Sequence, residues 1–157
     1  MRRKDREITD LDRIQDIIAS CDVCRLALHD EEYPYIVPLN FGFERQGDAF
    51  VLYFHCARVG KKLDLLRKNN RVSFEMDTAR KLIDGPEACD YTMEFESVIG
   101  TGTAELVQGE DKLHGLRLLM KQYVPDDREW TFGEKMVQAV EVIRLVCQNV
   151  TGKALQK

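Results

Sequence analysis

The sequence predicts a mainly β fold, a small antiparallel barrel of six strands with flanking helices. Six runs rich in β-branched and aromatic residues are bounded by turn residues. The links between the first runs are too short for the crossovers that parallel strands require. A chain of 157 residues is also the size of one domain with its own core. We therefore expect a single domain over residues 1–157, with an N-terminal helix at about 9–20 and the barrel at about 22–150.

An amphipathic helix opens the expected fold. Thr9 or Asp10 can cap its N terminus, and apolar residues then recur on one helical face. Short turns, "DEEYP" and "RQGD", separate the three β-like runs that follow, which is the pattern of an antiparallel meander. These strands are expected at residues 23–30, 35–44 and 49–56.

The second half mixes strands and helices. Gly100 and Gly102 lie within the longest β-like run and indicate a bend where the barrel turns a corner. The Gly-Pro pair near residue 85 is typical of a loop. The expected elements are a helix at about 60–69, a strand at 71–77, a loop at 79–90, a strand at 91–107, a helix at 109–124, a loop with a helical turn at 125–138 and a last strand at 140–150.

Composition narrows the functional classes. The net charge is −4 and no long basic run is present, which argues against nucleic acid or an anionic membrane as a partner. No apolar run reaches the length of a membrane span, and the basic start leads into polar sequence, so we expect a cytoplasmic protein. Five irregularly spaced cysteines fit reduced thiols.

Two lysines, Lys61 and Lys62, open the short helix, where the macrodipole is already positive. A bound phosphate would resolve this conflict by accepting bonds from the backbone near Gly60 and from both ammonium groups. Alternatively, both side chains extend into water and Asp64 compensates their charge. The pattern is not a P-loop, because Lys62 stands where a Ser or Thr would be needed.

Other polar residues allow structural readings. His55 ends a strand just before the helix and could contact a substrate, although a lone histidine is more often structural. Cys21 and Cys24 have redox or zinc spacing, but no second pair completes a site, so we expect structural thiols and no metal. Strand alternation assigns four carboxylates to solvent-facing positions: Glu75, Asp77, Glu94 and Glu96.

Three segments carry a family resemblance: "PYIVPLNFGFE", "LYFHCARVGKKLDLLRKNNRVSFEMD" and "ESVIGTGTAEL". They resemble the pyridoxamine 5'-phosphate oxidase-like family of FMN-binding split barrels, and within it the nitroimidazole-resistance, or nitroimidazole reductase, branch. The resemblance runs from about residue 2 to residue 153. It implies a six-stranded antiparallel split barrel that forms a homodimer, with one FMN in each of two clefts at the subunit interface.

The resemblance also implies roles for particular residues. Lys61 and Lys62 would hold the FMN phosphate, and His55 would lie beside the flavin as the catalytic residue. Ser97 and Val98 would reach the cofactor, from the same or the other subunit. The isoalloxazine ring and ribityl chain would be lined by Val37, Pro38, Leu39, Asn40, His55, Cys56 and Ala57.

This resemblance implies an FMN-dependent oxidoreductase that reduces a small flat acceptor such as a nitroimidazole. The uncharged "VPLNFG" strand and the ending "VTGKALQK" depart from oxidases of pyridoxamine phosphate and argue against oxidation of vitamin B6. No nicotinamide motif identifies an electron donor, and Trp130 has no assigned role. The alternatives are a flavin-binding carrier or sensor without turnover, and a split barrel that binds haem or a deazaflavin. For haem, His55 or Cys56 could supply the axial ligand.

Overall fold

The structure is a computed structural model that describes residues 3–124, 126 and 128–155, with the side chains of residues 79 and 80 left aside. The strands form one antiparallel sheet, in the strand order β3-β2-β6-β7-β8-β5-β4, and the two-residue strand β1 pairs with β8. The strands are β1 Glu7–Ile8, β2 Cys24–Leu28, β3 Tyr35–Leu39, β4 Gly42–Gln46, β5 Ala49–Ala57, β6 Arg71–Ile83, β7 Thr92–Val107 and β8 Val140–Leu155. The helices are α1 Leu11–Ser20, α2 Lys61–Lys68, α3 Gly109–Tyr123 and α4 Glu134–Ala139, with 3₁₀ turns η1 Lys4–Arg6 and η2 Ala88–Asp90.

The mainly β antiparallel class predicted from the sequence is confirmed, and eight strands form among the described residues in place of the expected six because one expected strand is divided and the short β1 was not expected. The expected strand at 35–44 is two strands, β3 and β4, which lie at opposite ends of the sheet order. Between them, the Phe41 N–H donates to the Tyr123 hydroxyl at 3.0 Å instead of to a neighbouring strand. At residues 40–41 the chain therefore passes from β3, which pairs with β2, to β4, which pairs with β5. The barrel is split at this point.

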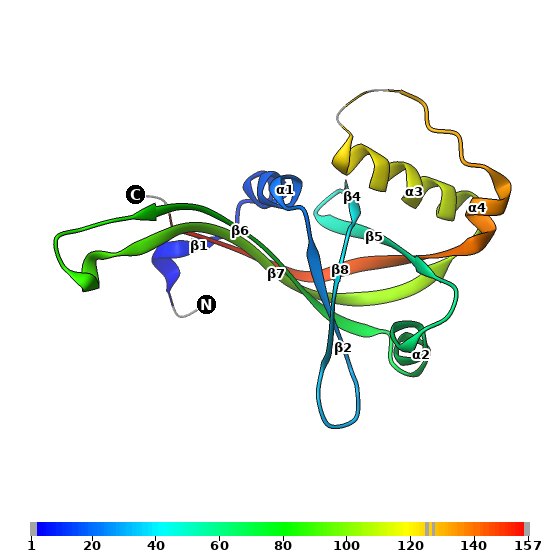
Figure 1. Ribbon diagram of the computed structural model, residues 1–157, viewed down its shortest axis with the longest axis horizontal. Helices are drawn as coiled ribbons and strands as arrows, with labels where there is room; N and C mark the ends of the chain where they lie inside the picture. The colour runs from blue at the N-terminus through cyan, green and yellow to red at the C-terminus, as the bar shows by residue number, and fades with distance from the viewer. Residues whose placement is uncertain (1–2, 125, 127, 156–157) are drawn as a thin grey trace.

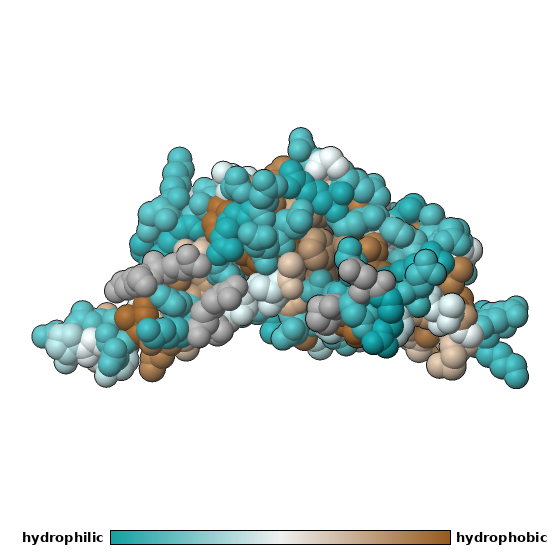
Figure 2. Space-filling model, turned by 90° about the horizontal axis from the view of Figure 1, so that it is seen from above, coloured by the Kyte–Doolittle hydropathy of each residue, from teal (hydrophilic) through white to brown (hydrophobic). Residues whose placement is uncertain are grey.

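The β6–β7 hairpin forms a long arm at one end of the molecule (Figures 1 and 2). The loop expected at 79–90 is wrong for residues 79–83, which continue β6 through a bulge and pair with Thr92–Phe95 of β7. Lys81 lies opposite Glu94, and Leu82 lies opposite Met93, so cross-strand pairs extend the ladder. Only the tip, residues 84–91, is a loop.

The bend expected in the long strand is confirmed by the register. The β7–β8 ladder shifts between Thr101 and Gly102. A Cβ on Gly102 would lie 2.3 Å from the Val146 carbonyl oxygen, and one on Gly100 would lie 2.4 Å from the Phe74 ring. Both glycines are therefore required by close approach of the strands and the core.

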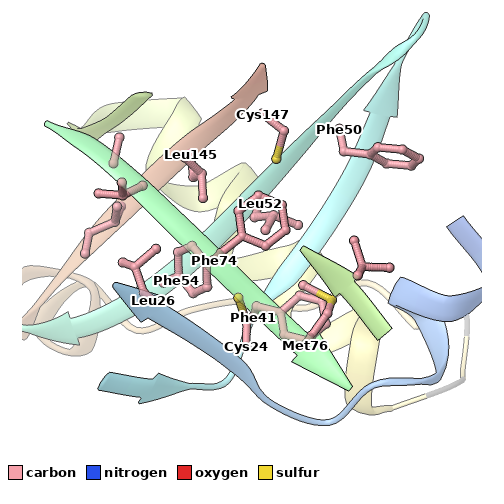
Figure 3. Close-up of a cluster of buried hydrophobic side chains, with 14 of the residues drawn as sticks. Cys24, Leu26, Phe41, Phe50, Leu52, Phe54, Phe74, Met76, Leu145 and Cys147 are labelled. Atoms are coloured by element: carbon pink, nitrogen blue, oxygen red, sulfur yellow. The ribbon is translucent and has the colours of Figure 1, made fainter. Parts of the chain in front are cut away.

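The core fills the space enclosed by the curled sheet and α1. Asp10 caps α1 by accepting a hydrogen bond from the Arg13 N–H at 2.7 Å, and Ile14, Ile17 and Ile18 are buried on one helical face. Figure 3 shows aromatic, aliphatic and sulfur-bearing side chains from several strands meeting there. A second apolar cluster lies where α3 covers β5 and β8. Within the described part of the chain, no helix is long and apolar enough to cross a membrane.

Candidate functional site

The last residues of β5 form an open strand edge. The β4–β5 ladder ends where Gly42 pairs with Tyr53, whereas the β5–β8 ladder continues to Ala57. Phe54 and Cys56 are buried, and His55 and Ala57 between and after them are exposed. Among the described strands, the backbone of residues 54–57 therefore pairs on one side only, with β8, and the exposed His55 side chain lies at this edge.

A second open edge is β3, which pairs only with β2 among the described strands. Val37 and Leu39 are half-buried and pack against the core, and Pro38 and Asn40 are exposed. Asn40 is fixed at the end of the strand because its side-chain amide donates to the Asp22 carbonyl oxygen at 3.3 Å. The predicted "VPLN" segment thus offers backbone groups and two apolar side chains at a sheet edge.

The N terminus of α2 lies between these two edges. Gly60 precedes the helix with φ of 143°, a conformation that favours glycine, and no side chain caps the first turn. The Lys61 ammonium lies 5.2 Å from the centre of the Tyr35 ring on β3. Burial raises the pKa of the Cys56 thiol on β5, and the nearby positive charge of Lys62 opposes that rise. Lys61 therefore lies beside the β3 edge, and the positive charge of Lys62 acts on the end of β5.

Lys61 has a counter-charge that the sequence did not indicate. Its Nζ lies 2.5 Å from Oδ2 of Asp30, in the turn between β2 and β3. This hydrogen bond raises the pKa of Lys61 and lowers the pKa of Asp30. The alternative in which Asp64 compensates the charge of the two lysines is not what forms, because Asp64 pairs with Arg67 at 3.1 Å.

Ser97 and Val98 lie elsewhere on the sheet. Ser97 pairs with Asp77 and Lys153, whereas the β8 partner of His55, Val142, pairs with Val107 of β7. Ten residues of β7 separate these positions, which corresponds to about 30 Å along an extended strand. Val98 is also fully buried, so its side chain belongs to the core. One chain alone therefore does not bring Ser97 to His55.

The two cysteines with redox spacing are core residues. Cys21 ends α1, Cys24 begins β2, and both are buried free thiols. Burial raises the pKa of Cys21 to about 11 and raises that of Cys24 further. Thiols held in this protonated form are poor nucleophiles and poor metal ligands. Among the described residues, no group of three His, Cys, Asp or Glu side chains could hold a metal ion.

A hollow of about 850 Å³ lies beside this opening and contains none of the predicted contact residues. Asp30 and neighbouring turn residues form one wall, and Arg71, Thr101 and Gln148 lie on the sheet side. The hollow therefore faces the outer surface of β6, β7 and β8, next to the Lys61–Asp30 pair.

Sequence reasoning missed two further polar groups. Glu96, expected on a solvent face, is fully buried and pairs with Arg13 of α1. Glu44 accepts from the Tyr53 hydroxyl at 3.0 Å and lies 3.0 Å from His114 Nε2. Both groups join elements distant in sequence, so no local spacing could have revealed them. The only sequence signal for the buried Glu96 was its partner Arg13, an arginine on the polar face of α1.

Comparison with known proteins agrees with the fold. Residues 10–154 match the family model described as pyridoxamine 5'-phosphate oxidase. A search of curated proteins finds no match. A solved structure from Bacteroides thetaiotaomicron, named for 5-nitroimidazole antibiotic resistance, is 32% identical with a TM-score of 0.81, covering 94% of this chain and 86% of that chain.

Two more distant structures share the fold. The flavocytochrome from Azotobacter vinelandii is 21% identical with a TM-score of 0.81, covering 100% of this chain and 72% of that chain. The FAD and haem binding protein from Mycobacterium smegmatis is 18% identical with a TM-score of 0.82, covering 97% of this chain and 74% of that chain. The family match across nearly the whole sequence, together with the split antiparallel sheet, shows that this chain belongs to the pyridoxamine 5'-phosphate oxidase-like split-barrel family and resembles its nitroimidazole-resistance branch.

Proposed function

We propose that the protein binds FMN at the opening between β3, β5 and α2 and uses it to reduce a small flat acceptor such as a nitroimidazole. The observation that carries this proposal is the uncapped N terminus of α2, where Lys61 lies beside Tyr35 of the β3 edge and the positive charge of Lys62 acts on Cys56 of β5. The similarity to the Bacteroides protein named for nitroimidazole resistance favours this acceptor class.

The residues at the opening fit the chemical groups of FMN. Free N–H groups at a helix N terminus and two ammonium groups suit a phosphate dianion. Strand edges with unpaired backbone groups suit the hydrogen-bonding edge of a flavin ring, and the half-buried Val37 and Leu39 suit its apolar surface. His55, Cys56 and Ala57 lie on the opposite edge, where they would flank the ring and the ribityl chain.

A homodimer would complete the site. Ser97 lies about ten residues along β7 from the position level with His55, so a flavin held by α2 of one chain would meet Ser97 only from a second chain. The outward face of β7 and β8 also exposes two large apolar side chains, Ile99 at 54% and Val146 at 39%. Apolar groups on an uncovered sheet face favour contact with another protein surface.

The reduction itself would use the electron-transfer chemistry that FMN supplies when bound. The part of the chain would be to bind, orient and exclude water. Lys61 and Lys62 would anchor the phosphate, and the β3 edge would fix the ring. The exposed His55 imidazole would donate a hydrogen bond or a proton to the acceptor as negative charge develops on it.

The visible spectrum of the purified protein titrated with FMN tests the proposal. Saturable binding at one FMN per chain, with a shifted flavin band, is the expected result. Absence of binding would overturn the flavin site. A Soret band would instead identify a haem-binding split barrel. The similar structure from Mycobacterium smegmatis is named as a FAD and haem binding protein.

Turnover is tested separately from binding. Reduced FMN on the protein should be reoxidised faster by a nitroimidazole than by oxygen alone in the matched sample. Equal rates would favour a flavin carrier or sensor. A His55→Ala variant should bind FMN and lose most of the nitroimidazole-dependent rate, and an unchanged rate would remove His55 from the mechanism.

A further inference from the structure

We propose that Asp30 is a built-in counter-ion of the phosphate site, which occupies Lys61 in the empty protein and opposes phosphate binding there. This inference rests on the proposed FMN site. It assigns the β2–β3 turn, to which the resemblance gave no site residue, a role in setting how strongly the site prefers phosphorylated ligands.

The contact is specific in its geometry. Oδ2 of Asp30 lies 2.5 Å from the Lys61 Nζ, and the same carboxylate accepts from the Glu31 N–H through Oδ1 at 3.0 Å. The turn thus presents the carboxylate with one oxygen held by backbone and the other on the ammonium. The Tyr35 ring lies on another side of that ammonium, 5.2 Å away. A phosphate approaching Lys61 therefore meets a cation whose charge is already neutralised.

Only one of the two lysines is held in this way by Asp30. The positive charge of Lys62 acts instead on the buried Cys56 thiol, whose pKa is raised by burial against the opposing effect of Lys62. The site would then have two unlike anchors: Lys62 presents its charge to the ligand, and Lys61 contributes once Asp30 is displaced or shares the ammonium. Asp30 therefore lowers the affinity for an anion without blocking its entry.

The size of this effect follows from exposure. The Lys61 side chain is 56% exposed and that of Asp30 is 24% exposed, so water screens the pair. Screened ion pairs of this kind contribute little, which limits the change in affinity to about fivefold. Because a free Lys61 ammonium contributes more when the phosphate beside it carries more charge, Asp30 should oppose the FMN phosphate dianion most, a singly charged phosphate of FAD less, and riboflavin not at all.

The test is the dissociation constant for FMN, FAD and riboflavin in the wild type and in Asp30→Asn, measured at low salt. Asparagine keeps an oxygen for the Glu31 N–H and removes the charge. We expect FMN to bind about threefold to fivefold more tightly to Asp30→Asn, FAD to gain less, and riboflavin to stay unchanged. Unchanged or weaker FMN binding would overturn the role of Asp30.

Two matched variants separate this contact from general electrostatics. Glu32→Gln removes the same charge from the same turn, and among the described residues the ion pair of Lys61 is with Asp30 and not with Glu32. It should leave FMN affinity unchanged, and a gain equal to that of Asp30→Asn would overturn the proposal. In a Lys61→Gln background, Asp30→Asn should give no gain, and a persisting gain would overturn it equally.

The outcomes also distinguish this inference from the function on which it rests. If the wild type binds no FMN, both fall. If the wild type binds FMN and Asp30→Asn leaves the affinity unchanged, the flavin site stands and the counter-ion falls.

Discussion

The two halves of β5 behave differently although they form one continuous strand. Residues 51–54 are buried, and the strand there is paired on both sides up to Tyr53 and covered by α3. Residues 55–57 pair only with β8, and His55 and Ala57 are exposed. The change occurs where β4 begins at Gly42. Beyond the end of the β4–β5 ladder, β5 contributes exposed residues to the proposed site as well as buried residues to the core. A split barrel exposes a strand edge without giving up its hydrophobic core.

The neighbouring residues Phe54 and His55 test this contrast most strongly. Phe54 is fully buried, so Phe54→Ala should lower the free energy of unfolding by about 3–5 kcal/mol through lost burial and a cavity. His55→Ala should change it by less than about 0.5 kcal/mol because the side chain is exposed. Urea denaturation measures both. Similar losses in the two variants would show that the edge is part of the core.

Two carboxylates on β7 extend the comparison to ion pairs. Glu96 is fully buried against Arg13, so Arg13→Met should cost about 3 kcal/mol because a buried charge loses its partner. Glu105 pairs with Arg144 at the surface with 52% of its side chain exposed, and Glu105→Ala should cost less than about 1 kcal/mol. Thermal and urea unfolding check the order, and a reversed order would contradict the assigned environments.

The two ends of α2 offer a comparison within the site. Lys61→Glu combined with Lys62→Glu should weaken FMN binding by at least about tenfold while the fold persists, since charge-assisted bonds are lost. The matched variant, Arg67→Glu combined with Lys68→Glu, makes the same charge change at the other end of the helix. It should leave FMN affinity within about threefold. Equal weakening by both would show that net charge, and not position, controls binding.

A further contrast concerns Glu44, which links β4 to the buried half of β5 and whose contribution should depend on pH. Burial acts to raise the pKa of Glu44, and hydrogen bonds from His114, Tyr53 and Gln46 outweigh it, so the pKa lies below the usual 4.5. A depressed folded-state pKa stabilises the protein above the unfolded pKa, and this stabilisation is lost as the pH falls through the folded pKa. Glu44→Gln should cost on the order of 1 kcal/mol at pH 7. The cost should shrink near pH 3, and a constant cost would contradict the ionised role.

Local patterns predicted the parts of the fold that depend on neighbours in sequence. The Asp10 cap, the apolar face of α1, the short α2 and the glycine bend in β7 all follow from spacing and residue type. The division of residues 35–44 into β3 and β4 could not be read in this way. It depends on Tyr123, a residue far along the chain, which also donates to the Asp22 carbonyl oxygen at 2.8 Å.

The site shows the same limit. The charge conflict of Lys61 and Lys62 with the helix dipole is visible in the sequence, and it indicated an anion site. Helical spacing predicts the nearby Asp64 as the partner of Lys61. The actual partner, Asp30, is contributed by the turn between two other strands. Long-range pairing of this kind is set by the sheet order and not by any local motif.

Native mass spectrometry of the FMN-loaded protein tests whether two chains share each FMN site, because the proposed site needs Ser97 from one chain and Lys61, Lys62 and His55 from another. We predict a dimer that carries two FMN molecules, and loss of FMN when dilution separates the chains. A monomer that retains one FMN would contradict it.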